Sequence, residues 1–205
     1  MSEKKASYPV SIIGELTEPP GRGWWLIKWL LALPHYIILW FLWIAFFVVT
    51  VIAFFAILFT AKYPKALFDF NVGVMRWSWR VGFYSYQALG TDKYPPFTFK
   101  AGGYPADLEV VYPERLSRGL VLVKWWLLAI PQYIVVVLFQ GGGGNNSNAG
   151  LVPILTIFAG VVLLFKGRYP EDIFKVVVGM NRWTYRVWIY ASLMTDRYPP
   201  FRLWD

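Results

Sequence analysis

Two long passages of this chain repeat each other, and this duplication constrains the possible folds more than any other feature. The first copy runs from Arg22 to about Phe99 and the second from Arg118 to about Leu203. Both contain, in the same order, K-W, P-x-Y-I, R-W-x-x-R-V and T-D-x-Y-P-P-F. A duplicated unit rich in apolar and aromatic residues is typical of a pseudo-symmetric membrane protein. We therefore divide the chain into an N-terminal extended segment on the cytoplasmic side (1–21), repeat 1 (22–99), a linker with a strand (100–117) and repeat 2 (118–205).

Charged residues are strongly segregated along the chain. Hydrophobic residues make up 57% and charged residues only 16%, and no charged residue lies between Lys28 and Lys62 or between Lys124 and Lys166. Each window exceeds the roughly 18–20 apolar residues that cross a bilayer, and tryptophans flank the lysines at the window edges, as they do at membrane surfaces. The pattern predicts an all-α polytopic membrane protein. Its net charge of +8 then favours membrane phospholipids with anionic headgroups as partners, and not nucleic acid.

The first window is too long for one ordinary crossing. Its 33 residues would form a helix of about 50 Å, whereas the hydrocarbon core is about 30 Å thick. In the topology that we favour, each repeat is a transmembrane hairpin. It turns near Trp43 in repeat 1 and at the glycine- and asparagine-rich run Gln140–Gly150 in repeat 2. The expected crossings are Trp24–Leu42, Ile44–Ala61, Leu120–Phe139 and Leu151–Phe165.

Two prolines support a second topology. Pro34 and Pro131 fall within the apolar windows, and a proline inside a helix kinks it. In this alternative, the residues before the proline lie in the membrane interface and a single helix crosses after it. We prefer the hairpin because the Gly/Asn loop is uncharged while basic residues gather at the other ends, as they do on cytoplasmic sides. We thus expect a multi-pass protein of the bacterial plasma membrane, with both termini cytoplasmic and parallel repeats.

A third helical segment follows in each copy, at Ala66–Gly90 and Ile173–Met194. It carries paired arginines four residues apart, which share one helix face. Burying an arginine at the bilayer centre costs roughly 2.5–3.5 kcal/mol, so we expect an amphipathic interfacial helix with the arginines toward headgroups. A polar stripe opposite the arginines leaves a second possibility, packing against a neighbouring helix. The arginines are Arg76, Arg80, Arg182 and Arg186, and the stripe is Asn71, Ser78 and Ser85.

Four short segments contain strand-forming residues with partial alternation. They are Tyr8–Leu16, Phe97–Lys100, Asp107–Tyr112 and Phe201–Trp204. We expect them to form one small β region at the cytoplasmic face that ties the two repeats together.

These motifs together resemble a known family. The combination of R/K-Y-P, G-x-x-R-W-x-x-R-V and T-D-x-Y-P-P-F, with the joining phrase Y-P-A-D-L-E-V-V-Y-P-E-R-L-S-R-G, is similar to bacterial, mainly actinobacterial, tandem-repeat membrane proteins catalogued only as a domain of unknown function. The resemblance covers nearly the whole chain and implies no activity. Among the positions that differ between the copies, Gln132 and Lys175 stand where the first copy has His35 and Asp69.

Few residues are suited to catalysis. His35 is the only histidine and the chain has no cysteine, so a metal site or a cofactor is not expected. A polar hydrogen-bonding position for His35 is favoured over a proton relay. Asp92 and Asp196 repeat in T-D-x-Y-P-P, where turn chemistry is favoured over an ion pair to a repeat arginine and over general acid–base catalysis.

The predicted function is therefore a non-enzymatic integral membrane scaffold or accessory subunit. It would bind anionic lipid and a protein partner or itself, as a homo-oligomer or as part of a larger membrane complex. A channel or transporter is the alternative, with its pathway at the pseudo-symmetry axis or between protomers. An enzyme acting on lipid is a third class, limited to Asp92 and Asp196. The predicted contacts to lipid headgroups or a partner are Arg76, Arg80, Arg182, Arg186, Lys28 and Lys124.

Overall fold

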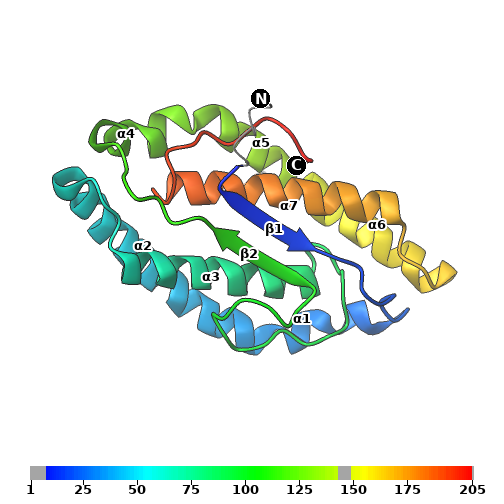
Figure 1. Cartoon of the computed structure of the whole chain (residues 1–205). Coiled ribbons are helices and arrows are strands. Elements are labelled where there is room, and N and C mark those ends of the chain that lie inside the picture. Colours follow the sequence, from blue (N-terminus) through cyan, green and yellow to red (C-terminus); the bar gives the residue numbers. More distant parts are fainter. Residues whose placement is uncertain (1–7, 143–148, 205) are drawn as a thin grey trace, which may run out of the picture.

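The computed structural model describes residues 8–142 and 149–204 of the chain, which are mostly helical with one small sheet (Figure 1). The strand β1 (Val10–Gly14) precedes repeat 1, which comprises a 3₁₀ turn η1 (Trp24–Leu26) and helices α1 (Lys28–Leu31), α2 (Leu33–Thr60) and α3 (Lys65–Tyr84). The strand β2 (Ala106–Val110) lies in the linker, and repeat 2 comprises α4 (Arg118–Val123), a π-helical turn η2 (Lys124–Leu128), α5 (Ile130–Gln140), α6 (Leu151–Lys166) and α7 (Glu171–Ala191).

The register of the sheet shows how the two repeats are related. β1 and β2 pair antiparallel, with Ile12 opposite Leu108 at the centre of the ladder. These two residues are equivalent, because each comes three residues after a Tyr-Pro pair. Equivalent residues face each other in an antiparallel pair at a twofold axis, so a pseudo-twofold axis passes through the middle of the sheet. In Figure 1 a half-turn about this point exchanges α3 with α7 and α2 with α5 and α6.

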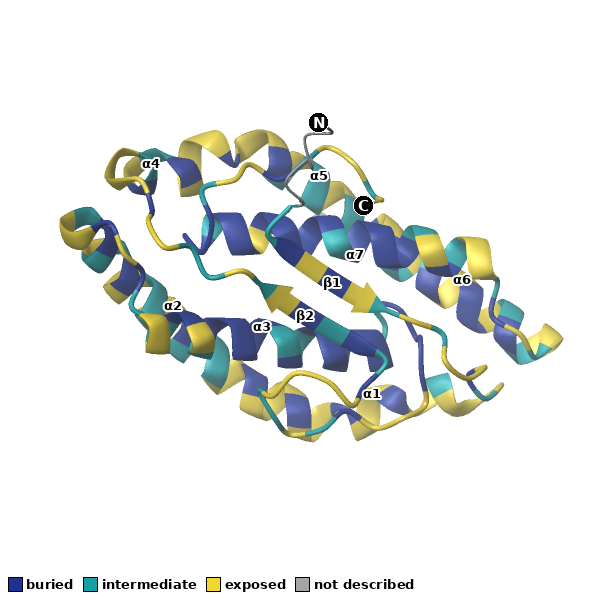
Figure 2. Cartoon of the chain, viewed as in Figure 1, coloured by how far each residue is buried: buried dark blue, intermediate teal, exposed yellow. Residues whose placement is uncertain are grey.

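Helices α3 and α7, which correspond to the predicted third helical segments, form the core of the protein. The position in the membrane interface that the sequence predicts for them is wrong. α3 and α7 lie directly against the sheet, and most of their residues are buried (Figure 2). The face that bears the arginines meets the strands. The opposite face of α3 packs on α2 through the polar stripe: Asn71 donates to Thr50, and Ser78 accepts from the Trp43 indole. Packing against a neighbouring helix is thus the possibility that the structure confirms for this stripe.

Only two of the four expected strands form. Val10–Gly14 and Ala106–Val110 pair as predicted, but the segments around Phe99 and Leu203 are irregular. Their backbone carbonyls bind side chains instead of a strand, since Phe99 O accepts from Arg76 Nη1 at 2.7 Å. Phe99 also lies so close to Gly73 that a Cβ there would sit 2.8 Å from it. The β region is therefore a two-stranded sheet, and the irregular segments cover α3 and α7.

The predicted hairpin turn near Trp43 is wrong. α2 is one uninterrupted helix from Leu33 to Thr60, and Trp43 lies in its interior. Pro34 is in the first turn of this helix, where proline fits because the N–H that it lacks has no intrahelical partner. Residues before the proline form the separate short elements η1 and α1. This agrees with the second topology in having one continuous helix after the proline.

Repeat 2 contains the same long helix with an insertion. α5 ends at Gln140, which is equivalent to Trp43, and α6 begins at Leu151 and continues in the direction of α5 (Figure 1). An antiparallel bridge between Gly141 and Ala149 brings the two ends of the insertion together. The predicted loop falls largely on residues 143–148, which lie outside the described residues. The insertion therefore interrupts a helix and does not separate two antiparallel crossings.

A one-residue difference between the copies is absorbed as a π turn. The first copy reads K-W-L-L-A-L-P and the second K-W-W-L-L-A-I-P. The segment Lys124–Leu128 is π-helical, and such a turn accommodates one extra residue without shifting the residues after it. As a result, Lys124 and Gln132 occupy the same places as Lys28 and His35.

The outer helices expose an unusually apolar surface. Large hydrophobic side chains lie exposed along α2, α5 and α6, including Phe47 and Phe59 on α2 (Figure 2). Among the described residues α2 alone is long and apolar enough by itself to cross a membrane. The segments Arg118–Leu128 and Ile130–Gln140 pass the same test only when joined, and they meet at 45°. Soluble monomers rarely expose a continuous apolar surface of this kind.

Candidate functional site

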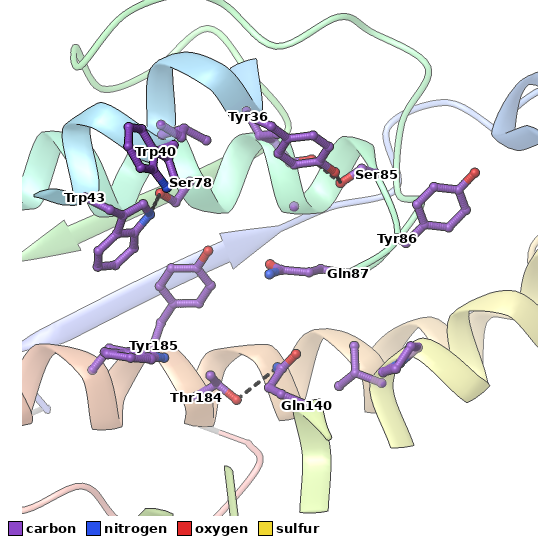
Figure 3. Close-up of a pocket in the computed structure, with 16 residues that line it drawn as sticks. Tyr36, Trp40, Trp43, Ser78, Ser85, Tyr86, Gln87, Gln140, Thr184 and Tyr185 are labelled. Carbon is purple, nitrogen blue, oxygen red and sulfur yellow. Dashed lines mark hydrogen bonds between the residues drawn. The ribbon is translucent and has the colours of Figure 1, made fainter. Parts of the chain in front are cut away.

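A cleft lies between the two repeats, on the side of α3 and α7 that faces away from the sheet. Its larger part has a volume of about 740 Å³, within the range typical of small-molecule sites. It includes equivalent residues from both copies, so it lies at the pseudo-twofold axis. Figure 3 shows α3 and α2 on one side, α7 with α5 and α6 on the other, and the strands behind. None of the sixteen lining residues is charged.

Matching hydrogen bonds build the two walls of this cleft. In repeat 1 the Trp43 indole donates to Ser78 Oγ at 3.1 Å. At the equivalent positions of repeat 2, Gln140 Nε2 donates to Thr184 Oγ1 at 3.1 Å. Each bond ties the long apolar helix of its repeat to the core helix. The cleft is thus bordered by two fixed polar contacts inside an apolar setting.

One polar atom of the cleft has no partner. Gln87 Oε1 is buried and accepts no hydrogen bond from any described residue. Its approach requires Gly82, because a Cβ at that position would lie 2.0 Å from Gln87 Oε1. In Figure 3 the Gln87 amide and the Tyr185 hydroxyl project into the space between the repeats from different sides. Burial raises the pKa of Tyr185, which keeps this hydroxyl neutral.

A second hollow adjoins the first. It has a volume of about 570 Å³ and is lined by aromatic and aliphatic side chains of α2, among them Phe46, Phe47 and Phe54. Trp43 and Trp188 line both hollows, and their rings lie 5.9 Å apart across the boundary between the repeats. The cleft therefore has a part with polar groups and an apolar part, separated by a tryptophan pair.

The four predicted arginines bind the opposite side of the core helices. Arg76 pairs with Asp107 at 2.9 Å, and its Nε also donates to Leu108 O; Arg182 Nε donates to the equivalent Ile12 O. Each of these two arginines thus holds the strand that precedes the other repeat. Burial lowers the pKa of the wholly buried Arg80, and the nearby Asp107 opposes this shift.

Arg186 is also buried. Its Nη1 donates to Arg202 O at 3.3 Å, and its guanidinium lies over the Tyr8 ring. Buried guanidinium groups have no surface to offer a headgroup, so we propose no lipid contact for Arg80 and Arg186. Arg76 and Arg182 are only half-buried, but both bind backbone carbonyls of the strands.

The two predicted lysines are likewise buried, each against the aspartate of its own T-D motif. Lys28 Nζ contacts Asp92 Oδ1 at 2.8 Å and Thr91 O at 2.7 Å. Lys124 Nζ makes the equivalent contacts with Asp196 and Thr195. Burial lowers the pKa of Lys28, and its hydrogen bond and charge interaction with Asp92 oppose this shift.

The aspartates also accept backbone hydrogen bonds across the fold. Asp92 accepts from the Gly21 N–H and Asp196 from the equivalent Ser117 N–H. The T-D motif therefore makes an ion pair, but to a lysine and not to a repeat arginine. It anchors the segment before each apolar helix to the segment after each core helix.

The comparison with known families matches both repeats. The family described as "Domain of unknown function (DUF4389)" matches residues 23–98 and again residues 123–202. The chain belongs to the DUF4389 family. The family resemblance expected from the motifs is thereby confirmed. No curated protein and no solved structure matches the chain.

The structure adds a strand to the DUF4389 repeat as it occurs here. The matched regions begin after β1 and after β2, yet these strands precede the two copies at equivalent positions and pair with each other. The DUF4389 core helix of each copy binds the strand of the other through Arg76 or Arg182. In this chain the two repeats are therefore structurally interdependent.

His35 has a packing role shared with its counterpart in the second DUF4389 repeat. The Trp77 indole donates to His35 Nδ1 at 3.0 Å, and the equivalent Trp183 indole donates to Gln132 Oε1 at 2.6 Å. Both acceptors are buried. This agrees with the hydrogen-bonding interpretation of His35 that we favour from the sequence.

Sequence reasoning misses the cleft. The helical pattern places Ser78 in the polar stripe and Gln87 on the arginine face, and nothing in it marks Tyr185. The one available signal is the difference at equivalent positions, Trp43 against Gln140 and Gly82 against Trp188. Such a difference breaks the symmetry of the duplication where the two copies meet.

Proposed function

We propose that this protein is a non-enzymatic integral membrane scaffold or accessory subunit whose apolar helices lie in one leaflet of the bilayer. The observation that carries the proposal is that both ends of α2 are attached to the same polar layer, which consists of the sheet and the irregular segments that cover α3 and α7 (Figure 1). Before its start, Lys28 binds Asp92. At its end, the Ala61 carbonyl accepts a hydrogen bond from the Leu116 N–H at 2.9 Å.

The segment from Asp92 to Leu116, which connects the two residues that hold the ends of α2, favours a position of α2 along the membrane. Residues 92–116 include β2 and exposed charged side chains such as Lys100 and Glu109. An open two-stranded sheet and exposed charges are not tolerated in hydrocarbon. If α2, about 42 Å long, crossed the bilayer, this segment would have to run through the bilayer beside it. An in-plane position for the apolar helices avoids that cost.

Exposed basic residues at the ends of the apolar helices are better headgroup contacts than the buried ones that the sequence predicts. One group, basic corner 1, contains Arg22, Lys166 and Arg168, and the Arg22 guanidinium lies against Gly167. Its counterpart, basic corner 2, contains Lys62, Arg115 and Arg118. Glu171 lines a hollow at basic corner 1 together with Lys166 and Arg168. A basic residue near an anionic surface contributes about 1 kcal/mol.

Vesicle binding tests the lipid part of this proposal. The full chain is reconstituted from detergent with phosphatidylcholine vesicles, with or without about 30 mol% phosphatidylglycerol, which gives the surface a negative potential. Arg22→Gln with Arg168→Gln should reduce the preference for anionic vesicles by roughly tenfold or more, because two headgroup contacts are lost. The matched control is Lys93→Gln with Lys100→Gln, which removes the same charge from loops near the sheet. An equal loss in both variants would show a general charge effect and would contradict the corner assignment.

The partner part of the proposal concerns either a second copy or another membrane protein. The large exposed apolar surface and the many exposed tryptophans support it. Native mass spectrometry of the protein extracted in mild detergent distinguishes the cases, because a heteromeric mass identifies an accessory subunit and a multiple of the chain mass identifies self-association. A monomer that carries only lipid would remove the partner from the proposal.

The channel alternative has less support within one chain. On the sheet side of the core helices, the pseudo-twofold axis is filled by buried side chains, including Ile12, Leu108 and Trp79. A pathway between protomers stays a prediction, which solute flux in proteoliposomes would test.

A structural role for the aspartates of the two T-D motifs supports the non-enzymatic assignment. Asp92 and Asp196 are each paired with a buried lysine. Among residues 8–142 and 149–204, no group of three or more His, Asp or Glu is placed to hold a metal ion.

A further inference from the structure

We propose that the cleft between the repeats binds one molecule of a neutral lipid with a single acyl chain and a hydroxyl-bearing polar end. The inference rests on the proposed membrane position, because a lipid reaches the cleft from the apolar surface. Trp40 and Trp188 line the larger hollow and are also 61% and 48% exposed. The cleft thus extends to the surface that we place in the bilayer.

The polar end is specified by hydrogen bonding. A buried acceptor without a partner costs about 1–3 kcal/mol, and such an atom in a native fold calls for an explanation. Gln87 Oε1 is one of these and lies on the Gly82 side of its amide. The Gln87 side chain lines the larger hollow, and its amide and the Tyr185 hydroxyl project into the space between the repeats (Figure 3). A ligand hydroxyl would donate to Gln87 Oε1, and the Tyr185 hydroxyl is a partner for a second ligand oxygen.

The absence of charge from the cleft wall specifies a neutral ligand. The residues that line the larger hollow include no Lys, Arg, Asp or Glu. A carboxylate or phosphate buried there would lack a counter-charge and would pay a large desolvation cost. A neutral glyceride or fatty alcohol avoids this cost, whereas a fatty acid or an anionic phospholipid does not.

The adjoining hollow fits the acyl chain. It is lined almost entirely by apolar side chains, with Phe46, Phe47 and Phe54 along α2. The ring of Trp188 faces both hollows and contacts Trp43. A chain that leaves the polar part therefore passes this tryptophan pair before it reaches the phenylalanines.

Monooleoylglycerol is a suitable probe for the test. Radiolabelled monooleoylglycerol is titrated into the full-length protein in a maltoside detergent, with oleate and methyl oleate as competitors. We expect saturable binding of one molecule per chain, with both competitors at least tenfold weaker. Methyl oleate lacks the hydroxyl donors and oleate is charged. Equal competition by methyl oleate, or binding that does not saturate, would overturn the proposal.

Two variants locate the site, each with its own comparison. Trp188→Ala should weaken monooleoylglycerol binding at least tenfold, while Trp126→Ala should leave it unchanged. Both tryptophans are 48% exposed, but only Trp188 lines the cleft. Gln87→Leu should remove the preference for monooleoylglycerol over methyl oleate. A similar loss in Trp126→Ala and Trp188→Ala would contradict the site.

Failure here is separable from failure of the proposed function. Binding of the full chain to anionic vesicles depends on the basic corners and should be the same in Gln87→Leu as in the unmodified protein. Vesicle binding without monooleoylglycerol binding would reject the cleft assignment alone.

Discussion

The buried polar residues show the clearest correspondence between the two copies. Lys28 and Lys124 hold Asp92 and Asp196, and His35 and Gln132 hold Trp77 and Trp183. A buried charge is strongly destabilising when it lacks a partner, so each lysine fixes the position of its T-D motif. Because the aspartates also bind the backbone before each apolar helix, these few side chains connect the start and the end of each repeat.

The equivalence of His35 and Gln132 gives a prediction with an internal control. His35→Gln should change the free energy of unfolding by less than about 1 kcal/mol, because Gln132 already accepts the equivalent indole hydrogen bond in repeat 2. His35→Leu should cost about 1–3 kcal/mol, since the buried Trp77 N–H would then lack an acceptor. Unfolding in mixed detergent measures both. A large loss in His35→Gln would indicate a role for imidazole that glutamine cannot supply.

At the level of elements, the long apolar helix is the same in both repeats, although the sequence disguises it twice. The nine residues between Gln140 and Gly150 are an insertion whose ends close through the Gly141–Ala149 bridge. The additional tryptophan in K-W-W-L-L-A is taken up by the π turn. The glycine- and asparagine-rich run Gln140–Gly150 suggests a transmembrane hairpin, because a polar break in an apolar window usually marks a turn. The uninterrupted α2 decides against it.

Deleting one tryptophan from either copy tests the π turn. Removal of Trp126 should convert Lys124–Leu128 to an ordinary α turn like that of repeat 1, with the melting temperature lowered by at most about 3 °C, or about 1 kcal/mol. Repeat 1 has no π turn that could compensate for the removal of Trp29. The residues before Trp29 would therefore rotate by about 100° relative to the helix, and Lys28 would turn away from Asp92. We expect this deletion to lower the melting temperature by about 10 °C or more. Similar losses from both deletions would contradict the π-turn explanation.

At the level of the whole molecule, the combination of the repeats produces three layers. The sheet and the irregular segments form a polar layer, α3 and α7 form the core, and α2 with α5 and α6 forms the apolar layer (Figures 1 and 2). Each core helix binds the strand that precedes the other repeat, α3 through Arg76 and α7 through Arg182. The cleft lies between the halves on the apolar side, so it exists only when both copies are assembled.

Cysteine labelling tests how the apolar layer meets the membrane. The chain has no cysteine, so single substitutions at Gly23, Lys62 and Glu109 report without background on the two ends of the apolar segment and on the sheet. All three positions are exposed. We expect a membrane-impermeant maleimide to label all three from the same side of sealed vesicles, because both ends of α2 contact the polar layer. Labelling of Lys62→Cys only from the side opposite Glu109→Cys would show that α2 crosses.

The sequence was sufficient to identify the duplication, the family, the helical class, the spans of the helices that form the core and two of the four expected strands. These features depend on local composition, periodicity and identity between copies, which are readable without knowledge of distant contacts. The tertiary structure was needed to show that Arg76 and Arg80 face the strand before the other repeat, that Lys28 pairs with Asp92, and that Gln87 and Tyr185 line the same cleft. An amphipathic helix with arginines has the same pattern whether its polar face meets headgroups or strand carbonyls. Headgroups and strand carbonyls both accept hydrogen bonds from arginine, so the helix sequence does not distinguish them. The path of the chain between the repeats, which brings each strand to the core helix of the other repeat, decides between them.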